Sequence, residues 1–259
     1  MTTTPALAVK GLAKAFGGLK AIDNVTFTVP DGSLTAVIGP NGAGKTTVFN
    51  LVTNLFRPDA GEISFYGTSL IGRTPDEIAS LGLIRTFQTA RVFPGMTVLE
   101  NALAGAHLKV RSGLFRQMLW LGSARREERA LRAEAEALLD LVGLSSFRDA
   151  AGTDLPMGGQ KLLEVVRALM AHPRLLLLDE PAAGLNDKET EDLAELLSAV
   201  RGAGITVIVV EHNMSLVMSI SDQVVVLDAG AIAASGTPAE IQKDERVIAA
   251  YVGQGTVNL

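Results

Sequence analysis

The chain has 259 residues, of which 47% are hydrophobic and 20% charged, which suits one large globular domain with ample apolar material for a core. The net charge of −5 argues against a protein that holds nucleic acid through phosphate contacts. There is no cysteine for a disulfide, no run approaches 18 apolar residues, and residues 1–5 lack the pattern of a signal peptide.

Residues 7–94 are predicted to form short strands separated by turns. Apolar and β-branched runs at residues 7–9, 25–29, 34–38 and 62–66 are each bounded by Gly, Pro or Asp. Asp31 and Gly32 predict a turn between two of these strands. A helix is expected to begin near Thr47, so that a strand and a helix enclose residues 39–46.

Residues 39–46, with the sequence GPNGAGKT, fit the phosphate-binding loop G-x-x-x-x-G-K-[ST]. The preceding strand and following helix are the context that such a loop requires. Its backbone N–H groups and the helix N-terminus behind it are suited to cradle phosphates. Lys45 is predicted to reach the β- and γ-phosphates, and the Thr46 hydroxyl to bind Mg²⁺. The motif therefore predicts binding of ATP or GTP.

Residues 95–171 are predicted to be helical. Between residues 125 and 142, apolar side chains recur at helical spacing and charged ones occupy the opposite face. A second helix is expected at 162–171. The stretch 109–121 mixes basic and apolar residues, and two interpretations stay open. It contacts anionic lipid, or, as we favour, it is an insertion that packs the helical region onto the core.

Residues 172–236 are predicted to alternate strand and helix. Strands are expected at 174–178, 206–210 and 224–227, with a helix at 187–200. Continuous apolar runs are typical of strands buried on both faces, so this alternation predicts a doubly wound parallel sheet. Residues 252–259 are expected to be a frayed tail.

Two of these strands lead into candidate catalytic side chains. Asp179 and Glu180 come at the end of one apolar run, where the carboxyl edge of the sheet faces the phosphate loop. Asp179 is expected to hold Mg²⁺ directly or through water, and Glu180 to orient or deprotonate an attacking water. His212 follows the run 206–210 and belongs at the same edge. The other histidines, His107 and His172, match no motif and are expected to be structural or exposed.

These motifs together resemble those of ATP-binding cassette (ABC) ATPases. In chain order they are the phosphate loop, Phe87-Gln88, Gly158-Gly159-Gln160, Asp179-Glu180-Pro181 and Glu211-His212. The resemblance covers nearly the whole chain. It implies one α/β ABC ATPase domain over residues 1–259. Residues 7–94 with 172–236 then form a RecA-like P-loop core with an antiparallel β subdomain, 95–171 a helical subdomain with the signature motif, and 237–259 a C-terminal helix and tail.

The resemblance also implies roles for individual residues. Phe16 stacks on the adenine, and Gln88 contacts Mg²⁺ and links the core to the helical subdomain. Asp179 is the Mg²⁺ carboxylate, Glu180 the catalytic base, and His212 the switch histidine at the γ-phosphate. The residues expected to contact ATP in the phosphate loop and the signature motif are Asn41, Gly42, Ala43, Gly44, Lys45, Thr46, Thr47, Gly158, Gly159 and Gln160.

The sequence departs from the family pattern at two positions. Met157 stands where the signature usually has a serine, so one hydrogen bond to the γ-phosphate is missing, worth about 1–3 kcal/mol. Backbone N–H groups and the following helix dipole still point at the phosphate, and we expect altered closure rather than loss of function. Asn186 ends the D-loop, residues 183–186, where Asp is usual, so its charge is lost.

Within the family, the chain resembles the ATP-binding subunits of branched-chain amino acid (LIV-type) importers. Residues 85–88, 92–98, 180–186 and 211–214 carry this resemblance. It implies an ATPase that energises import of branched-chain amino acids or related amides and acids. The energy subunit of an envelope-lipid exporter is the alternative. A non-transport ABC protein is disfavoured because the chain has one cassette and no long insert.

The resemblance implies partners because one cassette supplies only half of each ATP site. A second ABC subunit, more often a paralogue than a second copy, is expected to pair with it head to tail. Two permease subunits and, indirectly, an extracytoplasmic binding protein complete the expected assembly, with no nucleic acid. The apolar stretch 89–94 is where a permease helix is expected to dock. This places the chain peripherally on the cytoplasmic face of the inner or plasma membrane.

Overall fold

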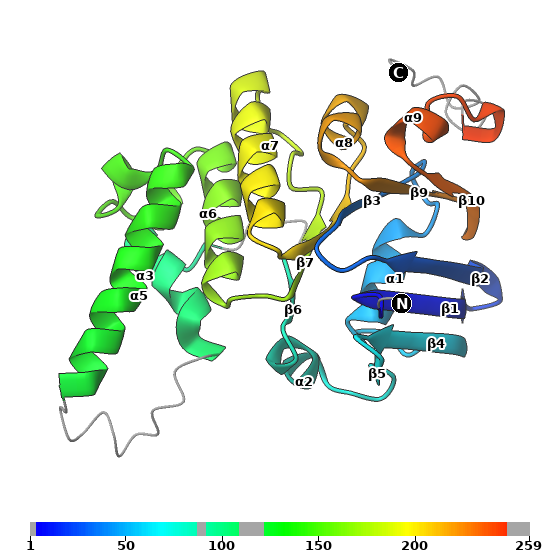
Figure 1. Ribbon diagram of the computed structural model, residues 1–259, viewed down its shortest axis with the longest axis horizontal. Coiled ribbons are helices and arrows are strands. Elements are labelled where there is room, and N and C mark those ends of the chain that lie inside the picture. Colours follow the sequence, from blue (N-terminus) through cyan, green and yellow to red (C-terminus); the bar gives the residue numbers. More distant parts are fainter. Residues whose placement is uncertain (1–3, 87–91, 109–121, 248–259) are drawn as a thin grey trace.

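The computed structural model describes residues 4–86, 92–108 and 122–247, without the side chains of 107–108 and 122–124 (Figure 1). A six-stranded sheet crosses the middle of the molecule in the order β10-β9-β3-β8-β7-β6. Strands β9, β3, β8, β7 and β6 pair in parallel, and β10 is antiparallel to β9. The strands are β3 (Leu34–Ile38), β6 (Leu83–Arg85), β7 (Leu175–Asp179), β8 (Thr206–Val210), β9 (Gln223–Asp228) and β10 (Ala231–Gly236).

A smaller antiparallel sheet, ordered β2-β1-β4-β5, is formed by the N-terminal part of the chain. Its strands are β1 (Leu7–Phe16), β2 (Leu19–Val29), β4 (Ala60–Phe65) and β5 (Thr68–Ser69). Figure 1 places this sheet to one side of the larger one, with helix α1 (Lys45–Val52) between them. Helix α1 is thereby covered, and all its apolar side chains are buried.

Helices occupy the opposite end of the molecule (Figure 1). Helix α3 (Val98–Ala104) packs against α5 (Gly122–Leu141) and α6 (Met157–Met170), while α7 (Asp187–Gly202) and α8 (Met214–Ile220) lie over the large sheet. Short elements connect them: α2 (Pro75–Ser80), η1 (Gly105–Leu108), η2 (Ser145–Phe147), η3 (Gly152–Asp154) and α9 (Pro238–Ile241). Within the residues described, no helix is both long and apolar enough to cross a bilayer.

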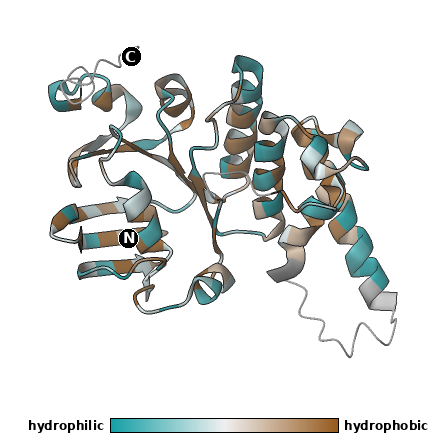
Figure 2. Cartoon of the chain, turned by 180° about the vertical axis from the view of Figure 1, so that it is seen from behind, coloured by the Kyte–Doolittle hydropathy of each residue, from teal (hydrophilic) through white to brown (hydrophobic). Residues whose placement is uncertain are grey.

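The large sheet separates two hydrophobic cores, which explains why most residues of its central strands are apolar (Figure 2). Alternate residues of one strand face opposite sides of a sheet. In β8, Val207 and Val209 join the core made with α5, α6 and α7, whereas Ile208 and Val210 join the core made with α1 and the small sheet. Every residue of β3, β7 and β8 is buried as a result.

Most of the predicted elements are confirmed. Strands 34–38 and 206–210 have the expected bounds, and the helices expected from Thr47, 125–142, 162–171 and 187–200 are α1, α5, α6 and α7. The strands predicted at 7–9 and 25–29 are parts of the longer β1 and β2. The strand predicted at 62–66 ends at Phe65, because Tyr66 has a φ of 45° and begins a turn. The tail predicted at 252–259 lies outside the described residues.

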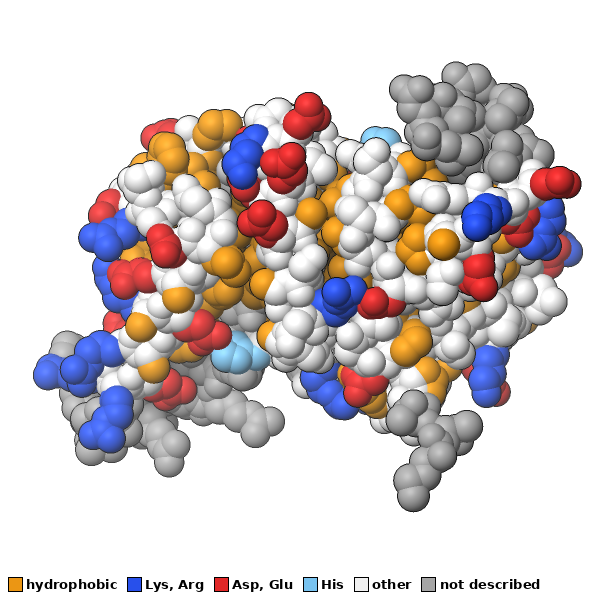
Figure 3. All heavy atoms as spheres, turned by 45° about the horizontal axis from the view of Figure 1, so that its top comes forward, with side chains coloured by type: hydrophobic (Ala, Val, Ile, Leu, Met, Phe, Trp, Pro, Cys, Tyr) orange, Lys and Arg blue, Asp and Glu red, His pale blue; other side chains and the backbone are white. Residues whose placement is uncertain are grey.

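On the face shown in Figure 3, acidic and basic side chains are interspersed along the helices, and hydrophobic side chains fill the hollows between them. This arrangement is typical of amphipathic helices that turn their charged stripe to water. Helix α5 illustrates it, since Ala135 and Leu139 are buried while most charged residues of the helix are exposed.

Candidate functional site

The register of the parallel strands brings three sequence motifs to one edge of the large sheet. Val37 of β3 pairs with Val210 of β8, and Val210 also pairs with Asp179 of β7. The segments that leave these strands therefore start side by side. They are the phosphate loop after β3, the Asp179–Glu180 pair at the end of β7, and Glu211–His212 after β8. The sequence predicted this edge correctly.

The phosphate loop leads directly into the N-terminus of α1. Gly44 is the residue before the helix, with a φ of 100° that favours glycine. A Cβ there would lie 2.9 Å from the carbonyl oxygen of Ala21. The helix has no side-chain cap and no acidic residue in its first turn. Its first N–H groups and positive dipole end are therefore not capped by a side chain, and they are suited to bind an anion.

Lys45 folds back over the loop in this conformation. Its ammonium donates hydrogen bonds to the carbonyl oxygens of Gly39 at 2.6 Å and Pro40 at 3.0 Å. Burial lowers the pKa of Lys45, and the carboxylates of Glu180 and Asp179 oppose that shift. The electrostatic effect of both acids on this ammonium places β7 and the phosphate loop around one site.

Asp179 forms a buried ion pair that the sequence did not reveal. Its Oδ2 accepts a hydrogen bond from Nη2 of Arg85 at 2.9 Å, and both side chains are almost fully buried. The Arg85 Nη1 also donates to Asn50 of α1 at 2.8 Å and to Thr53, directly after α1, at 3.2 Å. One guanidinium thus connects the ends of β6 and β7 to the helix that follows the phosphate loop. The sequence signal was a single arginine ending a short apolar run.

The second oxygen of Asp179 fits a magnesium ion. Its Oδ1 is buried and has no hydrogen-bond partner in the described part of the chain. Buried polar atoms are nearly always paired, so this oxygen is suited to a ligand. Carboxylate and hydroxyl oxygens are ligands that Mg²⁺ prefers, and Thr46 lies in the first turn of α1. Arg85 therefore takes one oxygen and leaves the other for a cation.

Glu180 has an unusual backbone conformation. Its φ is 50°, in the left-handed region that non-glycine residues rarely adopt. Its N–H donates to the carbonyl oxygen of Val210 at 2.9 Å, which ties the residue to β8. Its carbonyl oxygen accepts a hydrogen bond from the ammonium of Lys161 at 3.0 Å. Strained residues cluster at functional sites, where neighbouring contacts hold them in place.

Glu211, which the sequence analysis quoted only as part of a motif, is fully buried. Its Oε1 accepts the N–H of Ala182 at 2.6 Å, and its Oε2 accepts the N–H of His212 at 3.1 Å. The carboxylate thereby holds the turn after β7 and the turn after β8 together. The His212 side chain is 60% exposed and lies above this edge, free to contact a ligand. A carboxylate directly after four buried apolar residues, 207–210, was the available signal for Glu211.

The predicted signature residues begin helix α6. Gly158 approaches α7 so closely that a Cβ would lie 2.2 Å from a carboxylate oxygen of Glu189. The Gln160 amide donates to the carbonyl oxygen of Leu155 at 2.9 Å, so this side chain stabilises the turn before the helix. Met157 is 67% exposed. Helix α6, like α1, has no side-chain cap and no acid in its first turn, whereas α2, α3 and α7 each have a capping box with a glutamate.

Of the two predicted residues not yet placed, Phe16 lies on the small antiparallel sheet and Gln88 is outside the described residues. Phe16 ends β1, is 41% exposed, and packs edge-on against Phe56 with ring centroids 5.3 Å apart. An exposed ring of this kind is suited to stack on a base. Gln88, together with Phe87 and residues 89–91, lies outside the described residues, as does the stretch 109–121.

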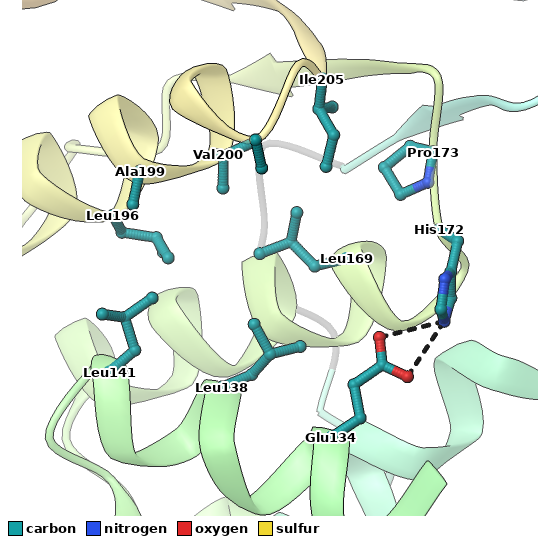
Figure 4. Close-up of a pocket in the computed structure, with 11 residues that line it drawn as sticks. Glu134, Leu138, Leu141, Leu169, His172, Pro173, Leu196, Ala199, Val200 and Ile205 are labelled. Atoms are coloured by element: carbon teal, nitrogen blue, oxygen red, sulfur yellow. Dashed lines mark hydrogen bonds and ion pairs between the residues drawn. The ribbon is translucent and has the colours of Figure 1, made fainter. Parts of the chain in front are cut away.

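A separate groove of about 390 Å³ lies between α5, α6 and α7 and contains none of the predicted nucleotide residues (Figure 4). Its lining is largely apolar. At one end Nε2 of His172 contacts the Glu134 carboxylate at 3.0 Å. His172 is therefore an exposed, structural histidine, as expected from the sequence. The side chain of His107 lies outside the described part of the chain.

The site combines three features. A glycine-rich loop after β3 leads into an uncapped helix, a carboxylate pair ends β7, and a histidine follows β8, which lies between them. This combination defines a nucleotide triphosphatase of the cassette type. Comparison with known proteins agrees. The ABC transporter family matches residues 22–183, and the branched-chain amino acid ATP-binding cassette transporter family matches residues 231–256. The chain belongs to the ABC transporter family, as one of its ATP-binding proteins.

The relatives include the high-affinity branched-chain amino acid transport ATP-binding proteins LivG of Salmonella typhimurium, 42% identical, and BraF of Pseudomonas aeruginosa, 43% identical. Each alignment covers 96% of this chain and 98% of the relative. Among solved structures, the ADP conformation of an ATP-binding cassette of an ABC transporter has 31% identity and a TM-score of 0.83. That alignment covers 97% of this chain and 100% of the other. The fold expected from the sequence is thereby confirmed.

Replacing Arg85 by methionine is expected to lower the free energy of unfolding by about 3–5 kcal/mol, because it leaves the buried Asp179 carboxylate without its counter-charge. Urea unfolding without Mg²⁺ measures this loss. The double variant Arg85→Met, Asp179→Asn should recover part of it, since no uncompensated charge then remains. Arg57→Met, at an exposed arginine, is the control and should change stability by less than about 0.5 kcal/mol. If Arg85→Met loses no more free energy of unfolding than Arg57→Met does, the structural role of the Arg85–Asp179 pair is contradicted.

Proposed function

We propose that this chain is the ATP-hydrolysing subunit that energises import of branched-chain amino acids, or of related small amides and acids, through separate membrane permeases. The observation that carries the proposal is the shared sheet edge, where the phosphate loop, Asp179–Glu180 and His212 converge. The relatives that match nearly the whole chain are transport ATP-binding proteins for branched-chain amino acids, which favours import over envelope-lipid export.

The phosphate loop binds the nucleotide phosphates in this proposal. Backbone N–H groups of Asn41, Gly42, Ala43 and Gly44, with the N-terminus of α1 behind them, surround the β-phosphate. Thr47, in the first turn of α1, completes this cradle. Lys45 exchanges its loop carbonyl partners for phosphate oxygens. Phe16 stacks on the adenine.

Mg²⁺ would be held by the Thr46 hydroxyl and Oδ1 of Asp179, with Gln88 as a further ligand. When bound, it neutralises charge that develops on the phosphates. The chain's own contribution is to orient Asp179, which Arg85 achieves by bonding its other oxygen. Thr46 presents its hydroxyl from the first turn of a buried helix, so its position is fixed with the phosphate loop.

Glu180 accepts the proton of the attacking water, and its fixed backbone aims the carboxylate at the γ-phosphate. His212 contacts the γ-phosphate from the neighbouring strand end. Its backbone N–H is bound by the buried Glu211, which holds the histidine against the turn that contains Glu180. Gln88, as the further ligand of Mg²⁺, would connect the site to the helical region.

A second cassette completes each ATP site. Gly158, Gly159 and Gln160 begin an uncapped helix, whose first N–H groups are suited to the γ-phosphate bound by the partner's phosphate loop. Such a helix end needs an anion from another molecule to satisfy its N–H groups. The resemblance to LIV-type importers implies a paralogue, rather than a second copy of this chain, as the second subunit.

The permease docks on the loop between β6 and α3. Phe93 and Met96 are 45% and 41% exposed there. The buried Asn101 fixes residues 93–97 of this loop, because its amide accepts the N–H of Phe93 at 2.8 Å and donates to the carbonyl oxygens of Met96 and Thr97. An exposed apolar tip on a rigid frame is suited to bind a partner helix. The proposed complex has two permeases and an extracytoplasmic binding protein, and places this chain on the cytoplasmic face of the membrane.

Glu180→Gln is expected to reduce steady-state ATP hydrolysis by at least about a hundredfold while ATP binding persists, because the amide cannot accept a proton from water. The variant should also trap an ATP-bound dimer, which size-exclusion chromatography detects. Glu191→Gln, at an exposed glutamate of α7, is the matched control and should hydrolyse ATP normally. Normal turnover of Glu180→Gln would remove its assignment as general base.

Met157→Ser is expected to tighten ATP binding at one site of the assembled complex by about tenfold, since it restores a hydrogen-bond donor to a charged phosphate. Titration of the complex with a fluorescent ATP analogue measures the change. Met157→Ala removes the thioether without adding a donor, so it separates the effect of the hydroxyl from that of side-chain size. If affinity and turnover stay unchanged in Met157→Ser, the site is not tuned by this position.

Phe93→Asp is expected to abolish recovery of the permeases when the tagged chain is purified from gently solubilised native membranes. A charge at the exposed apolar tip opposes its burial in an interface. Leu141→Asp, at a residue of α5 that is 55% exposed, is the matched control and should recover two permeases and a second cassette. Mass spectrometry identifies the partners of each. Envelope-lipid export components in place of amino acid permeases would support the alternative function.

A further inference from the structure

The turn that follows β7 is held from both sides by buried groups of opposite charge. On one side, the ammonium of Lys161 on α6 donates to the carbonyl oxygens of Glu180, at 3.0 Å, and Ala183. On the other, the carboxylate of Glu211 accepts the N–H of Ala182 at 2.6 Å. Lys161 is 9% exposed and Glu211 is fully buried. Neither residue was assigned a role by the sequence motifs.

We infer that Lys161 is a positioning residue for Glu180, and that it makes the position of the catalytic carboxylate depend on helix α6. This inference rests on the proposed function, in which Glu180 is the general base. Lys161 does not contact the nucleotide in the proposed complex. It acts through the backbone of residues 180–183.

The backbone of Glu180 needs such a restraint. A left-handed conformation at a residue other than glycine is unfavourable and persists only where the surroundings impose it, and Glu180 has a φ of 50°. The N–H of Glu180 is fixed to Val210 of β8, and its carbonyl oxygen is fixed to Lys161. Losing the second contact frees this peptide unit to relax, and the carboxylate on the same residue moves with it.

A charged donor explains why this position holds a lysine although burial disfavours its charge. Burial lowers the pKa of Lys161, while the carboxylates of Glu211, Glu180 and Glu164 oppose the shift. A cationic donor makes stronger hydrogen bonds than a neutral one, and an ammonium supplies enough N–H groups for both carbonyl oxygens. A hydrophobic side chain of similar length fills the same space without either bond.

Helix α6 connects the Lys161 contact to the second cassette. Lys161 lies one helical turn after Met157 and Gly158, at the helix end that the second cassette engages in the proposed complex. A helix moves as a rigid element over so short a distance, so a displacement of its N-terminus moves the ammonium and the Glu180 carbonyl oxygen together. Binding of the partner at the N-terminus of α6 therefore changes the position of Glu180, the general base of this chain's own site.

The test compares Lys161→Met, Lys161→Arg and the control Lys10→Met, at an exposed lysine of β1, in the assembled complex. Lys161→Met should lower kcat for ATP hydrolysis by at least about tenfold and change KM and ATP affinity by less than about threefold, because it disturbs only the chemical step. Lys161→Arg retains the charged donor and should keep at least about a third of kcat. A normal kcat in Lys161→Met, or equal losses in Lys161→Met and Lys161→Arg, overturns the inference.

A double-mutant cycle with Glu180→Gln separates positioning from general damage. If Lys161 acts through Glu180, adding Lys161→Met to Glu180→Gln should lower the residual single-turnover rate by less than about twofold. A further tenfold loss means that Lys161 acts by another route. Thermal unfolding accompanies each variant, and if Lys161→Met does not fold, Lys161→Gln is judged by the same criteria. A wild-type complex without ATPase activity, or Glu180→Gln with normal turnover, refutes the proposed function instead.

Discussion

The register of β7, β8 and β3 is the constraint on which the site depends. Because Val210 is level with both Val37 and Asp179, the loops after these strands start at one height on the edge of the sheet. A shift of one residue in a parallel strand would turn Asp179 to the opposite face and move a different side chain to the edge. The register is in turn fixed by two hydrophobic cores, since each strand buries alternate residues in each of them.

The buried charges of the protein cluster around this edge. Lys45, Asp179, Glu211 and Lys161 are each less than a tenth exposed, and each has a partner from a different element. Burying ionised groups is unfavourable unless their hydrogen bonds are satisfied, so a fold gains little stability from them compared with apolar residues. Their common purpose is geometric. Lys161 holds the turn after β7 to α6, and Glu211 holds the turns after β7 and β8 to each other. Asp179 is bound to the end of β6 through Arg85, and Lys45 closes over the phosphate loop.

The elements that the sequence predicted are those whose signal lies in a few contiguous residues. Strands 34–38 and 206–210 were found with their bounds because each is a run of five residues with clear ends, and the phosphate loop because its glycines and lysine are contiguous. Strand β6 was missed because three residues carry little signal and its pairing with β7 joins parts of the chain far apart in sequence. Arg85, Lys161 and Glu211 were missed as contacts for the same reason, since each one binds a segment remote from it.

The two departures from the family pattern differ in what they change. Asn186 is the N-cap of α7 and accepts the N–H of Glu189 at 2.9 Å, while Glu189 accepts the N–H of Asn186 in return. Asparagine caps a helix as well as aspartate does, so this exchange preserves the start of α7. Met157 is exposed at the start of α6, a helix that has no side-chain cap. The exchange of serine for methionine therefore removes no capping hydrogen bond within the chain. Neither departure disturbs the fold of the single subunit, and we therefore expect Met157 to act where a second cassette meets α6 in the proposed complex.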